Sequence, residues 1–415
     1  MKLSEELQWR GFVNQTTYPD LSILDGDPIT FYWGVDPSAD SMQAGNFSIA
    51  MMIKHFVKHG HKPVLLVGGA TGMVGDPDGK DDERNLQSIE TIEKNKQSIS
   101  DQYRNIFGDV EFLIVDNYDW FKDFSYLEFL RSVGKNVPMS QMLGREFVQS
   151  RLGEGGAGIS YAEFSYALIQ GYDFVHLFKN HGVTLQVCGS DQWGNCIAGV
   201  ELIRRMEGGE AHIWSAPLVM NKTTGKKFGK TEDGAVWLDP AKTSPYKFYQ
   251  FWLNAGDDDV EDYLKIYTLL DKQSLDDIVV KFSDDKSARL AQKTLAYEVT
   301  KLVHSQYQAD KQKRIAEALF GSRGLPELTG EELDVVRAEI SSAKAAVGDS
   351  IFDVLLETGL VSSKTEARQL IKSGAVYING AQSVSEKIGS ADMIDGKFLL
   401  RKGKSFSNSA LIELK

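Results

Sequence analysis

The chain has 415 residues, of which 42% are hydrophobic and 25% are charged. This length is too great for one ordinary core and predicts two or three domains, while the composition excludes a fibrous or disordered protein. The formal net charge of −12 at pH 7 excludes a protein whose whole surface coats nucleic acid. Residues 350–415 differ from the rest, because they contain nine Lys or Arg against seven Asp or Glu and can form a local basic patch.

Two cysteines, Cys188 and Cys196, are too few for a disulfide framework or a four-thiolate zinc site, which fits a reducing compartment. The segment from Met1 to Leu7 is acidic and amphipathic and resembles neither a signal peptide nor a transit peptide. No uninterrupted apolar stretch approaches the length of a membrane span. We therefore expect a cytoplasmic protein with no membrane partner.

The first half of the chain alternates short apolar runs with helical patterns, which is typical of a parallel sheet flanked by helices. Residues 31–35 and 63–67 predict two strands on either side of a helix over 45–55. Residues 183–187 predict a later strand, which runs into a Gly/Ser turn and then a helix over 195–205. The expected fold class is therefore α/β.

The second half changes its pattern after Asp239-Pro240. From there to about residue 320 the apolar residues repeat with the 3.6-residue period of helices, which predicts a helical domain. Residues 321–347 are rich in Gly, Pro, Ser and charged residues, which predicts a linker. The last segment, from residue 350 to 415, is expected to form a compact unit of its own.

A glycine-dense segment, residues 68–80, follows directly after the strand predicted over 63–67. Glycines there let the backbone approach a ligand closely and turn amide N–H groups toward an anion. The segment is not a P-loop, because the required Gly-Lys-Ser/Thr ending is absent. A merely flexible surface loop is the alternative, but open α/β sheets bind ligands at the carboxyl ends of their strands, which favours a binding loop.

Two further segments favour a ligand site. Residues 189–195 form a second glycine-bearing turn at the end of a predicted strand, although Trp193 within it is expected to pack in the core. Residues 226–231 place several lysines on a glycine-flanked loop, and such cations can close over a triphosphate. A lysine-rich loop alone is usually solvated surface. Together with two loops at the edge of the sheet, this one predicts a phosphate lid.

One predicted helix presents three polar residues on the same face. Tyr166, Gln170 and Asp173 are separated by four and three residues and lie among apolar neighbours. A buried phenol, amide and carboxylate together require polar partners, and a ligand can supply them. The alternative, which is commoner in general, is a hydrogen-bond network that satisfies itself within a helix interface. The residues alone leave both interpretations open.

Several of these motifs resemble those of one known family. Bacterial-type tyrosyl-tRNA synthetases, which are class I aminoacyl-tRNA synthetases, have similar motifs in the same order, and the resemblance runs essentially from end to end. The matching segments are residues 36–41, 68–80, 191–195, 227–231 and 243–246.

The resemblance implies a Rossmann-like parallel-sheet catalytic domain, an α-helical domain and a small α+β domain similar to the S4 RNA-binding domain. It also implies a homodimer. The expected boundaries are 1–220 for the catalytic domain with a helical dimerisation insertion around 125–160, 221–238 for a KMSKS-type loop, 239–320 for an anticodon-side helical domain, 321–348 for a linker and 349–415 for the S4-like domain.

The resemblance further implies the reaction: ATP-dependent activation of L-tyrosine to tyrosyl-adenylate with release of pyrophosphate, then transfer to the 3′-terminal adenosine of tRNA(Tyr). The tyrosine carboxylate attacks the α-phosphorus, so the protein supplies positioning and charge stabilisation rather than a nucleophile. ATP is a substrate. Mg²⁺ is expected on the triphosphate, without a dedicated metal site on the protein.

Roles for individual residues follow from the positions that match the family's motifs. The tyrosine-binding residues are expected to be Tyr32 and Asp173 at the phenol, Asp76, Tyr166 and Gln170 at the α-ammonium, and Asp36, Gln186 and Gln192 in the same pocket. The expected catalytic residues are Lys227, Lys230, Gln43, Asn46, Lys80 and Arg84. The expected ATP-binding residues are Trp33, Ser38, Gly45, Gly189, Asp191, Lys227, Lys230 and Thr231. The expected RNA-binding residues are Arg145, Lys364, Arg368, Lys372, Arg401, Lys402 and Lys404.

The sequence departs from the family at its nucleotide site. Class I synthetases usually have His-x-Gly-His where residues 43–46 read Gln-Ala-Gly-Asn. Gln and Asn amides can also donate hydrogen bonds to phosphates but do not titrate, so we expect adenylation without a histidine-controlled loss near about pH 6 to 7. Trp33 and Cys188 stand where a small Cys and a Gly are common, and we expect them to alter the ATP pocket rather than tyrosine selection.

Two alternatives remain open at the level of the sequence. A tryptophanyl-tRNA synthetase shares the catalytic fold, but Tyr32 with Asp173 favours a phenol and an S4-like tail is unusual in that relative. A degenerate paralogue that only binds RNA would explain the lost histidines. Amino-acid-dependent exchange and RNA binding distinguish these alternatives.

Overall fold

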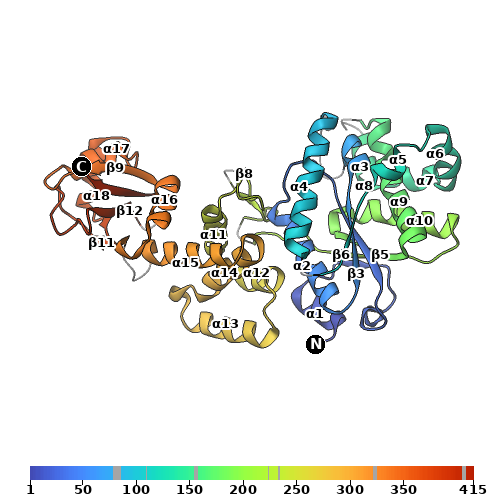
Figure 1. Ribbon diagram of the computed structural model, residues 1–415, viewed down its shortest axis with the longest axis horizontal. Coiled ribbons are helices and arrows are strands. Elements are labelled where there is room, and N and C mark those ends of the chain that lie inside the picture. Colours follow the sequence, from blue (N-terminus) through green and yellow to red (C-terminus); the bar gives the residue numbers. More distant parts are fainter. Residues whose placement is uncertain are drawn as a thin grey trace. The chain divides into compact units, whose positions relative to one another are not determined.

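The computed structural model describes residues 1–77, 86–108, 110–153, 158–222, 224–231, 234–320, 325–403 and 408–415. These residues form two compact units (Figure 1). The first contains Met1–Thr243 and Trp252–Leu295, and the second contains Ser244–Phe251 and Ala296–Lys415. Residues 239–320, expected as a separate helical domain, are instead divided between the two units. The reason is that α11 (Pro245–Leu253) and α14 (Leu290–His304) each contribute residues to both.

A six-stranded sheet forms the centre of the first unit. Its strands, in spatial order, are β1 (Gln15–Thr16), β6 (His212–Ala216), β5 (Val183–Gly189), β2 (Thr30–Val35), β3 (Lys62–Val67) and β4 (Leu113–Asp116). β1 is antiparallel to β6, and the other five strands are parallel. The strands predicted from the three apolar runs and the α/β fold class are therefore confirmed.

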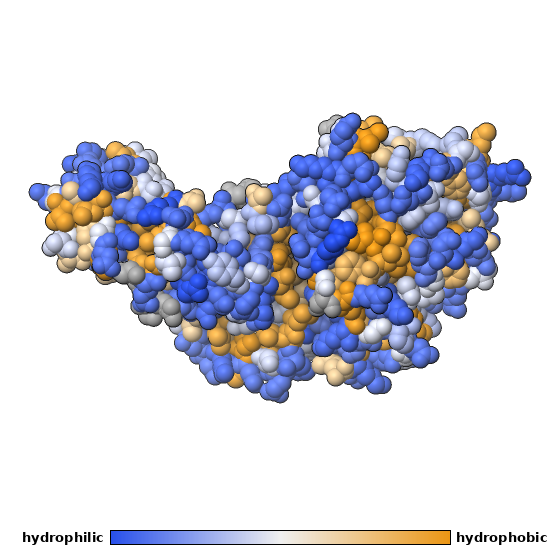
Figure 2. All heavy atoms as spheres, viewed as in Figure 1, coloured by the Kyte–Doolittle hydropathy of each residue, from blue (hydrophilic) through white to orange (hydrophobic). Residues whose placement is uncertain are grey.

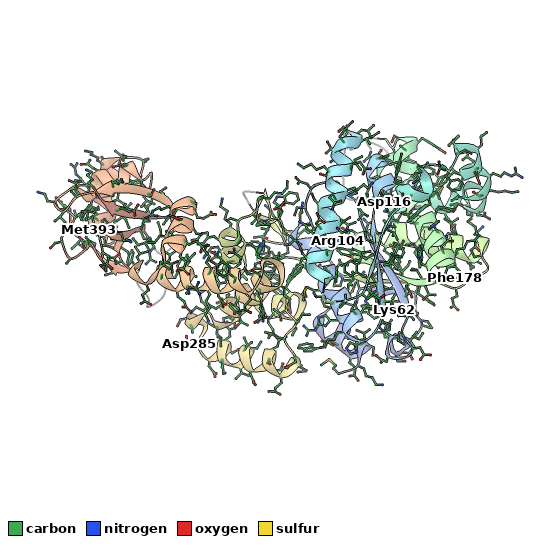
Figure 3. All side chains as sticks on the ribbon, in the orientation of Figure 1. Lys62, Arg104, Asp116, Phe178, Asp285 and Met393 are labelled. Atoms are coloured by element: carbon green, nitrogen blue, oxygen red, sulfur yellow. The ribbon has the colours of Figure 1, made fainter. Side chains whose placement is uncertain are left out.

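The order of the parallel strands reverses beside β2, because the chain adds β3 and β4 on one side and β5 and β6 on the other. In open parallel sheets, ligands bind at such a switch point, outside the carboxyl ends of the strands. Figure 3 shows Lys62, the first residue of β3, and Asp116, the last residue of β4, at opposite ends of the sheet. The expected binding end is therefore the end marked by Asp116.

Helices cover both faces of this sheet (Figure 1). On one face α2 (Ala44–Lys58) and α4 (Ile89–Phe107) contact β3, and on the other α9 (Tyr161–His181) and α10 (Trp193–Met206) contact β5. The other helical segments of this unit are α1 (Leu3–Arg10), η1 (Leu21–Asp25), α3 (Gly69–Val74), α5 (Tyr118–Phe121), α6 (Tyr126–Ser132), η2 (Gly134–Asn136), α7 (Met139–Leu143), α8 (Glu146–Leu152), η3 (Ser190–Gln192), α12 (Val260–Tyr267), α13 (Lys272–Asp284) and η4 (Lys286–Ala288). A two-stranded sheet joins β7 (Lys230–Thr231) to β8 (Gly234–Ala235).

The helix α9 has well-defined ends. At its start the backbone N–H of Glu163 donates to the Ser160 hydroxyl at 3.2 Å, and the backbone N–H of Ser160 donates to the Glu163 carboxylate at 3.1 Å. Such a capping box satisfies donors that the first helical turn leaves open. At its end Gly182 adopts a left-handed conformation with φ of 63°. The predicted shared face of Tyr166, Gln170 and Asp173 therefore lies on one continuous helix.

The second unit contains a five-stranded sheet. Its strands, in spatial order, are β11 (Ala381–Gln382), β10 (Val376–Ile378), β12 (Lys397–Lys402), β13 (Ser409–Leu414) and β9 (Ser341–Ala345). Its helical segments beyond α11 and α14 are α15 (Gln306–Phe320), η5 (Leu325–Glu327), α16 (Gly330–Glu339), α17 (Ile351–Glu357) and α18 (Lys364–Lys372). Side chains such as Phe398 and Leu400 share a core with α17 and α18, whereas Leu399 and Leu411 share another with α15 and α16.

The structure corrects the linker expected over 321–348, because the described part of that range contains α16 and β9. The side chain of Thr329 and that of Glu332 form a capping box that starts α16. Strand β9 pairs in parallel with β13, and its Ala343 and Ala345 are buried while Lys344 between them is exposed. The polar composition of this segment gave no signal of a strand. Its strand conformation depends on hydrogen bonds to β13, which lies far along the chain.

The surface of the first unit has an apolar region along its sheet edge. Leu113 of the edge strand β4 is 42% exposed, and Ile114 and Val115 are partly exposed. Figure 2 shows apolar atoms gathered beside α4 on this face. Among the helices that the structure describes, none combines the length and apolarity needed to cross a membrane.

Candidate active site

A cavity of about 370 Å³ opens at the carboxyl ends of β2 and β5, which is the switch point of the sheet. The sequence-predicted residues that line it are Tyr32, Trp33, Asp36, Ser38, Gln43, Gly45, Asn46, Asp76, Tyr166, Gln170, Asp173, Gln186, Gly189, Asp191, Gln192 and Lys227. The structure therefore brings together residues from β2, α2, α9, β5 and the loop over residues 226–231, called the lysine loop below. Lys80, Arg84 and Lys404 lie outside the described residues, as do the side chains of Lys230 and Thr231.

Tyr32 on β2 and Asp173 on α9 are among the most buried polar residues that line the cavity, and they are 1% and 2% exposed. The Tyr32 hydroxyl is buried and has no hydrogen-bond partner among the described residues. Burial, followed by the charges of Cys196 and Asp173, raises its pKa well above the ordinary value. Because a buried hydroxyl without a partner is costly, this group requires a polar ligand.

Asp173 is held by two donors from the segment after β4. The side-chain amide of Asn117 donates to Oδ2 at 3.0 Å, and the indole Nε1–H of Trp120 donates to Oδ1 at 3.0 Å. Burial raises the pKa of Asp173 well above its ordinary value, although these two hydrogen bonds oppose the rise. Each carboxylate oxygen keeps a further lone pair, so Asp173 can accept a hydrogen bond from a ligand hydroxyl.

A second chain of hydrogen bonds runs along the cavity wall at Asp36. The Tyr166 hydroxyl donates to Asp36 Oδ2 at 2.7 Å, and the Thr71 hydroxyl donates to Oδ1 at 2.6 Å. Gly68 allows this approach, because a Cβ at that position would lie 2.1 Å from Asp36 Oδ1. The network that satisfies itself, left open as an alternative for Tyr166, is thus present for this residue. It is not present for Gln170, whose buried Oε1 has no partner among the described residues.

The acceptor groups near the cavity floor form a third network. Asp76 accepts hydrogen bonds from Gln192 Nε2 at 2.7 Å and from Asn195 Nδ2 at 3.3 Å. Arg145, predicted to contact RNA, donates from its guanidinium to Asn195 Oδ1 at 2.7 Å. Asp76 and Arg145 are thereby joined through one amide. Together with Gln170 Oε1, this wall offers acceptors suited to an ammonium group.

The start of α2 and the lysine loop form the other end of the cavity. The backbone N–H of Gln43 donates to Asn46 Oδ1 at 3.1 Å, which leaves the Asn46 NH₂ group as a donor at the positive end of the helix. Gly229 packs against this helix end with φ of 88°, and a Cβ there would lie 3.3 Å from the backbone nitrogen of Gly45. The Lys227 ammonium donates to Asp191 Oδ2 at 3.0 Å.

The lysine loop is fixed at both of its sides. Phe228 lies among the rings of Trp252, Tyr263 and Tyr267, at centroid distances of 5.3, 4.3 and 5.6 Å. Two backbone hydrogen bonds, from Ala44 N–H to Val236 O and from Leu238 N–H to Met42 O, join the segment after the loop to the start of α2.

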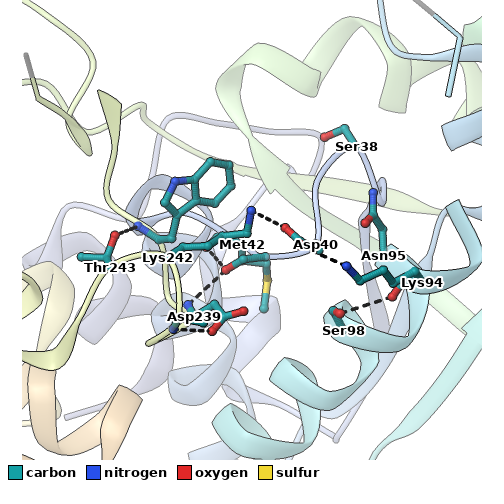
Figure 4. A network of polar contacts seen from close by, with 12 residues as sticks. Ser38, Asp40, Met42, Lys94, Asn95, Ser98, Asp239, Lys242 and Thr243 are labelled. Carbon is teal, nitrogen blue, oxygen red and sulfur yellow. Dashed lines mark hydrogen bonds and ion pairs between the residues drawn. The ribbon is translucent and has the colours of Figure 1, made fainter. Parts of the chain in front are cut away.

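A polar network strengthens this junction (Figure 4). Lys242 forms an ion pair with Asp40, and the backbone N–H of Asp239 donates to the Ser41 hydroxyl at 3.1 Å. Lys94 of α4 lies 4.0 Å from Asp40 on its other side. The loop after β2 is therefore tied both to α4 and to the segment that follows the lysine loop.

Sequence reasoning missed four residues that hold the cavity wall: Thr71, Asn117, Trp120 and Asn195. Asn117 and Trp120 follow β4, whose four residues are too few for a periodic pattern to predict a strand. The signal that could have found this segment is an apolar run, Leu113 to Val115, followed directly by polar residues, which is the kind of signal that identified the turn over 189–195. Asn195 lay in a predicted turn but received no role.

The geometry agrees with comparisons to known proteins. Residues 24–321 match the family described as tRNA synthetases class I (W and Y), and residues 332–406 match the tyrosine–tRNA ligase SYY-like C-terminal domain. The tyrosine–tRNA ligase of Staphylococcus haemolyticus is 45% identical over 416 residues, which cover 97% of each chain. This chain belongs to the tyrosine–tRNA ligase family. A second family member, from Bacteroides fragilis, is 43% identical over 423 residues that cover 97% of this chain and 98% of that protein.

A solved family member has the same architecture. The C-terminally truncated mitochondrial tyrosyl-tRNA synthetase of Aspergillus nidulans superposes with a TM-score of 0.70 and 30% identity over 77% of this chain and 94% of its own. The resemblance found in the motifs is thus confirmed as membership of the tyrosine–tRNA ligase family. Neither the tryptophanyl alternative nor the RNA-binding paralogue receives support, because both full-length relatives are tyrosine–tRNA ligases.

Proposed function

We propose that this chain activates L-tyrosine with ATP to tyrosyl-adenylate, releases pyrophosphate and transfers the tyrosyl group to the 3′-terminal adenosine of tRNA(Tyr). One observation carries this proposal: the Tyr32 hydroxyl, which has no partner in the described part of the chain, and the twice-bonded Asp173 carboxylate line the same cavity at the switch point of the sheet. A ligand hydroxyl fits between a donor and an acceptor of this kind.

The tyrosine would lie along α9. Its phenol would meet Tyr32 and Asp173, and its ammonium would meet Gln170 Oε1, with Tyr166 and Asp76 beside it. Asp36, Gln186 and Gln192 line the same cavity. Phenylalanine would leave the polar groups at the phenol end unpaired, and for this very enzyme class such rejection is known to be about 10⁵-fold.

The nucleotide would lie between α2 and the lysine loop. The tyrosine carboxylate oxygen attacks the α-phosphorus of ATP, the bond from that phosphorus to the bridging oxygen breaks, and pyrophosphate leaves with the electron pair. Positive charge and hydrogen-bond donors stabilise the charge that develops on the pyrophosphate. The residues assigned to this task are Gln43, Asn46, Lys80, Arg84, Lys227 and Lys230, and those assigned to the rest of ATP are Trp33, Ser38, Gly45, Gly189, Asp191 and Thr231.

Magnesium would accompany the triphosphate rather than occupy a protein cage. Across the described residues there is no group of three or more His, Cys, Asp or Glu side chains arranged to hold a metal ion. Asp191, the carboxylate at the nucleotide end, is already paired with Lys227. When bound, the ion would neutralise phosphate charge, and no step of the mechanism is assigned to a protein–metal contact.

A homodimer is supported by an exposed apolar surface on the helical insertion. The described segments around 125–160 contain large apolar side chains that are exposed in a single chain, and such gatherings mark interaction sites. They are Tyr126, Leu127, Leu130, Met139, Leu143 and Leu152, with exposed fractions from 38% to 75%. Nearby Tyr161 is 62% exposed and contacts Tyr126 through their hydroxyls at 3.3 Å.

Binding of tRNA is supported by the basic side of α18. Lys364, Arg368 and Lys372 are exposed and recur every four residues, so they form one row along the helix. On strand β12 Arg401 lies 4.9 Å over the Tyr377 ring and Lys402 pairs with Glu366 at 2.7 Å. Such a row can contact successive phosphates, and Arg145 would contact the acceptor end.

Amino-acid-dependent ATP–pyrophosphate exchange tests the activation step with tyrosine, phenylalanine and tryptophan in parallel. We expect exchange with tyrosine only, followed by charging of tRNA(Tyr) in a second assay. Exchange with tryptophan in place of tyrosine would refute the assignment of the phenol site. RNA binding without any exchange would favour a protein that has lost activation.

A further inference from the structure

We propose that His176 is a positioning residue for tyrosine selection, because it holds the Trp120 ring in the orientation from which its indole N–H reaches Asp173. This inference rests on the proposed function and adds a residue that does not touch the substrate. His176 would act through Trp120 and Asp173 on the discrimination between tyrosine and phenylalanine.

His176 contacts Trp120, and Trp120 in turn contacts Asp173. Trp120 Nε1 donates to Asp173 Oδ1 at 3.0 Å. The rings of Trp120 and His176 are stacked, with centroids 4.2 Å apart and planes 13° apart. His176 follows Asp173 by three residues on α9, so one helix face presents both the carboxylate and the ring that supports its donor.

Trp120 is only partly buried where it packs against the apolar core that contains Phe174, so a stacked ring adds to its support. It belongs to α5, a helix of four residues without a buried side chain. Hollows of about 390 Å³ and about 410 Å³ border both Trp120 and His176, the first lined also by Asp119 and the second by Phe124. Within the described part of the chain, His176 is the aromatic ring that stacks on Trp120.

The chemical state of His176 suits a stacking role. Burial, and then the neighbouring His181, lower the pKa of His176, which favours the neutral ring. A flat neutral ring that covers an indole face fixes the tilt of the indole through dispersion contacts over its whole area. The direction of the indole N–H follows this tilt, and a hydrogen bond weakens steeply as its angle departs from linear.

The consequence concerns the substrate hydroxyl. Burial already favours the protonated form of Asp173, and the Trp120 hydrogen bond favours the carboxylate. Loosening Trp120 would therefore rotate or protonate the acceptor that the substrate phenol needs. Tyrosine would lose a hydrogen bond to a charged group, whereas phenylalanine has no hydroxyl to lose. The ratio of their kcat/KM values should fall by about tenfold or more.

The test compares His176→Ala with His176→Phe, which restores a flat ring, and with His181→Ala. His181 is exposed, its ring lies 6.4 Å from that of His176, and it lines the same hollow. Pyrophosphate exchange gives kcat/KM for tyrosine and for phenylalanine with each full-length variant. We expect the tyrosine-to-phenylalanine ratio to fall in His176→Ala and to stay within about twofold of the parent in the other two variants.

Two outcomes would overturn the inference: an unchanged ratio in folded His176→Ala, or a fall as large in His176→Phe as in His176→Ala. If His176→Ala does not fold, the tyrosine-to-phenylalanine ratios of His176→Phe and His181→Ala decide. A lower ratio in His176→Phe contradicts support of Trp120 by a flat ring, and an unchanged ratio in His176→Phe agrees with it. Absence of tyrosine exchange in the parent protein would instead refute the proposed function, so the two failures are distinguishable.

Discussion

Arg10 of α1 donates a hydrogen bond from its guanidinium to the backbone carbonyl of Thr268, at 3.0 Å and between residues 258 positions apart in the chain. The same guanidinium donates to the carbonyls of Lys265 and Leu270, and it pairs with Glu6 at 3.1 Å. Arg10 is 1% exposed. It therefore joins α1 to the C-terminal end of α12, the helix that also supports Phe228.

Replacing Arg10 should destabilise the first unit strongly. Arg10→Met leaves three carbonyl groups without their donor and removes one of the cationic partners of the buried Glu6 carboxylate, which keeps His59 at 3.0 Å, and the loss of one partner of a buried ion pair costs about 3 to 5 kcal/mol. Urea unfolding measures this difference. The matched control is Arg104→Met, whose pair with Asp101 is 56% exposed on both sides and should change stability by less than about 1 kcal/mol. Equal effects of the two substitutions would contradict this account.

Glu6 should also give the protein a pH-dependent stability. Burial opposes its ionisation, but His55, His59 and Arg10 outweigh burial and hold the pKa of Glu6 well below its ordinary value of 4.5. A carboxyl with a lowered folded pKa contributes stability that is complete above the unfolded pKa and is lost as the pH falls below it. The difference in stability between the parent and Glu6→Gln should therefore be constant above about pH 4.5 and should shrink below it.

His55 should also lower the stability of the protein as the pH falls, but over a higher pH range. Burial lowers its pKa from 6.5 to about 4, so the unfolded chain binds a proton more readily than the folded one. Its neutral folded form should cost stability progressively as the pH falls from 6.5 to 4. The melting temperature of the parent should therefore fall relative to that of His55→Phe as the pH drops across this range. Parallel curves would show that His55 titrates equally in both states.

The Tyr32 hydroxyl should affect stability and activity in opposite directions. Tyr32→Phe removes a buried hydroxyl that has no partner among the described residues, so the free protein should gain up to about 1 kcal/mol. The same change removes a hydrogen bond to the substrate phenol, and kcat/KM for tyrosine should fall about tenfold or more. Thermal unfolding measures the expected gain in stability, and pyrophosphate exchange on the same sample measures the expected loss of activity. A loss of stability together with unchanged activity would contradict the proposed tyrosine site.

Gln43 should make the activation step insensitive to histidine titration. The parent is expected to show no loss of exchange activity attributable to a histidine near about pH 6 to 7. Gln43→His should introduce one, because an imidazole donor at the positive end of α2 changes its charge in this range. The pH profile of kcat for ATP–pyrophosphate exchange distinguishes the two proteins. Identical profiles would show that residue 43 does not contact the phosphates.

Trp33 should influence ATP more than tyrosine. Its ring is 4% exposed, lines the cavity and lies 5.5 Å from the Tyr103 ring on the face of the sheet covered by α4. Trp33→Cys would enlarge the nucleotide end and leave the Tyr32 and Asp173 end unchanged. We expect a larger change in the KM for ATP than in the KM for tyrosine, measured by exchange at saturating co-substrate. The opposite order would refute the placement of Trp33 beside the nucleotide.

Local sequence patterns were sufficient to predict those groups of site residues that lie on a single helix or strand. Tyr166, Gln170 and Asp173 could be grouped from helical spacing, and Tyr32 could be placed on a strand, because both inferences need only the period of one element. The groups that hold Asp173 could not be found in this way. Asn117 and Trp120 reach it from positions 56 and 53 residues away, and only the folded sheet brings them together.

The division of the second half shows the same limit. Strand β9 consists of Ser, Ala and Lys, which have little preference for strands, and pairs with β13 about seventy positions later. Its strand conformation comes from hydrogen bonds that no local window contains. The helical pattern before it was recognised, but periodicity does not say against which neighbours a helix packs, and the helices over 239–320 pack in two different units.

The helix α9 supplies Tyr166, Gln170 and Asp173 of the proposed tyrosine-binding residues, and it also supplies His176, which stacks on Trp120. A small rotation or translation of this one helix would displace the side chains at the phenol and those at the ammonium by the same amount. The contacts at one end of the substrate therefore could not be adjusted without changing those at the other end. Changes at its ends, such as loss of the Ser160 capping box, should therefore alter affinity for every tyrosine analogue in proportion. Changes along its face should instead alter the choice among them.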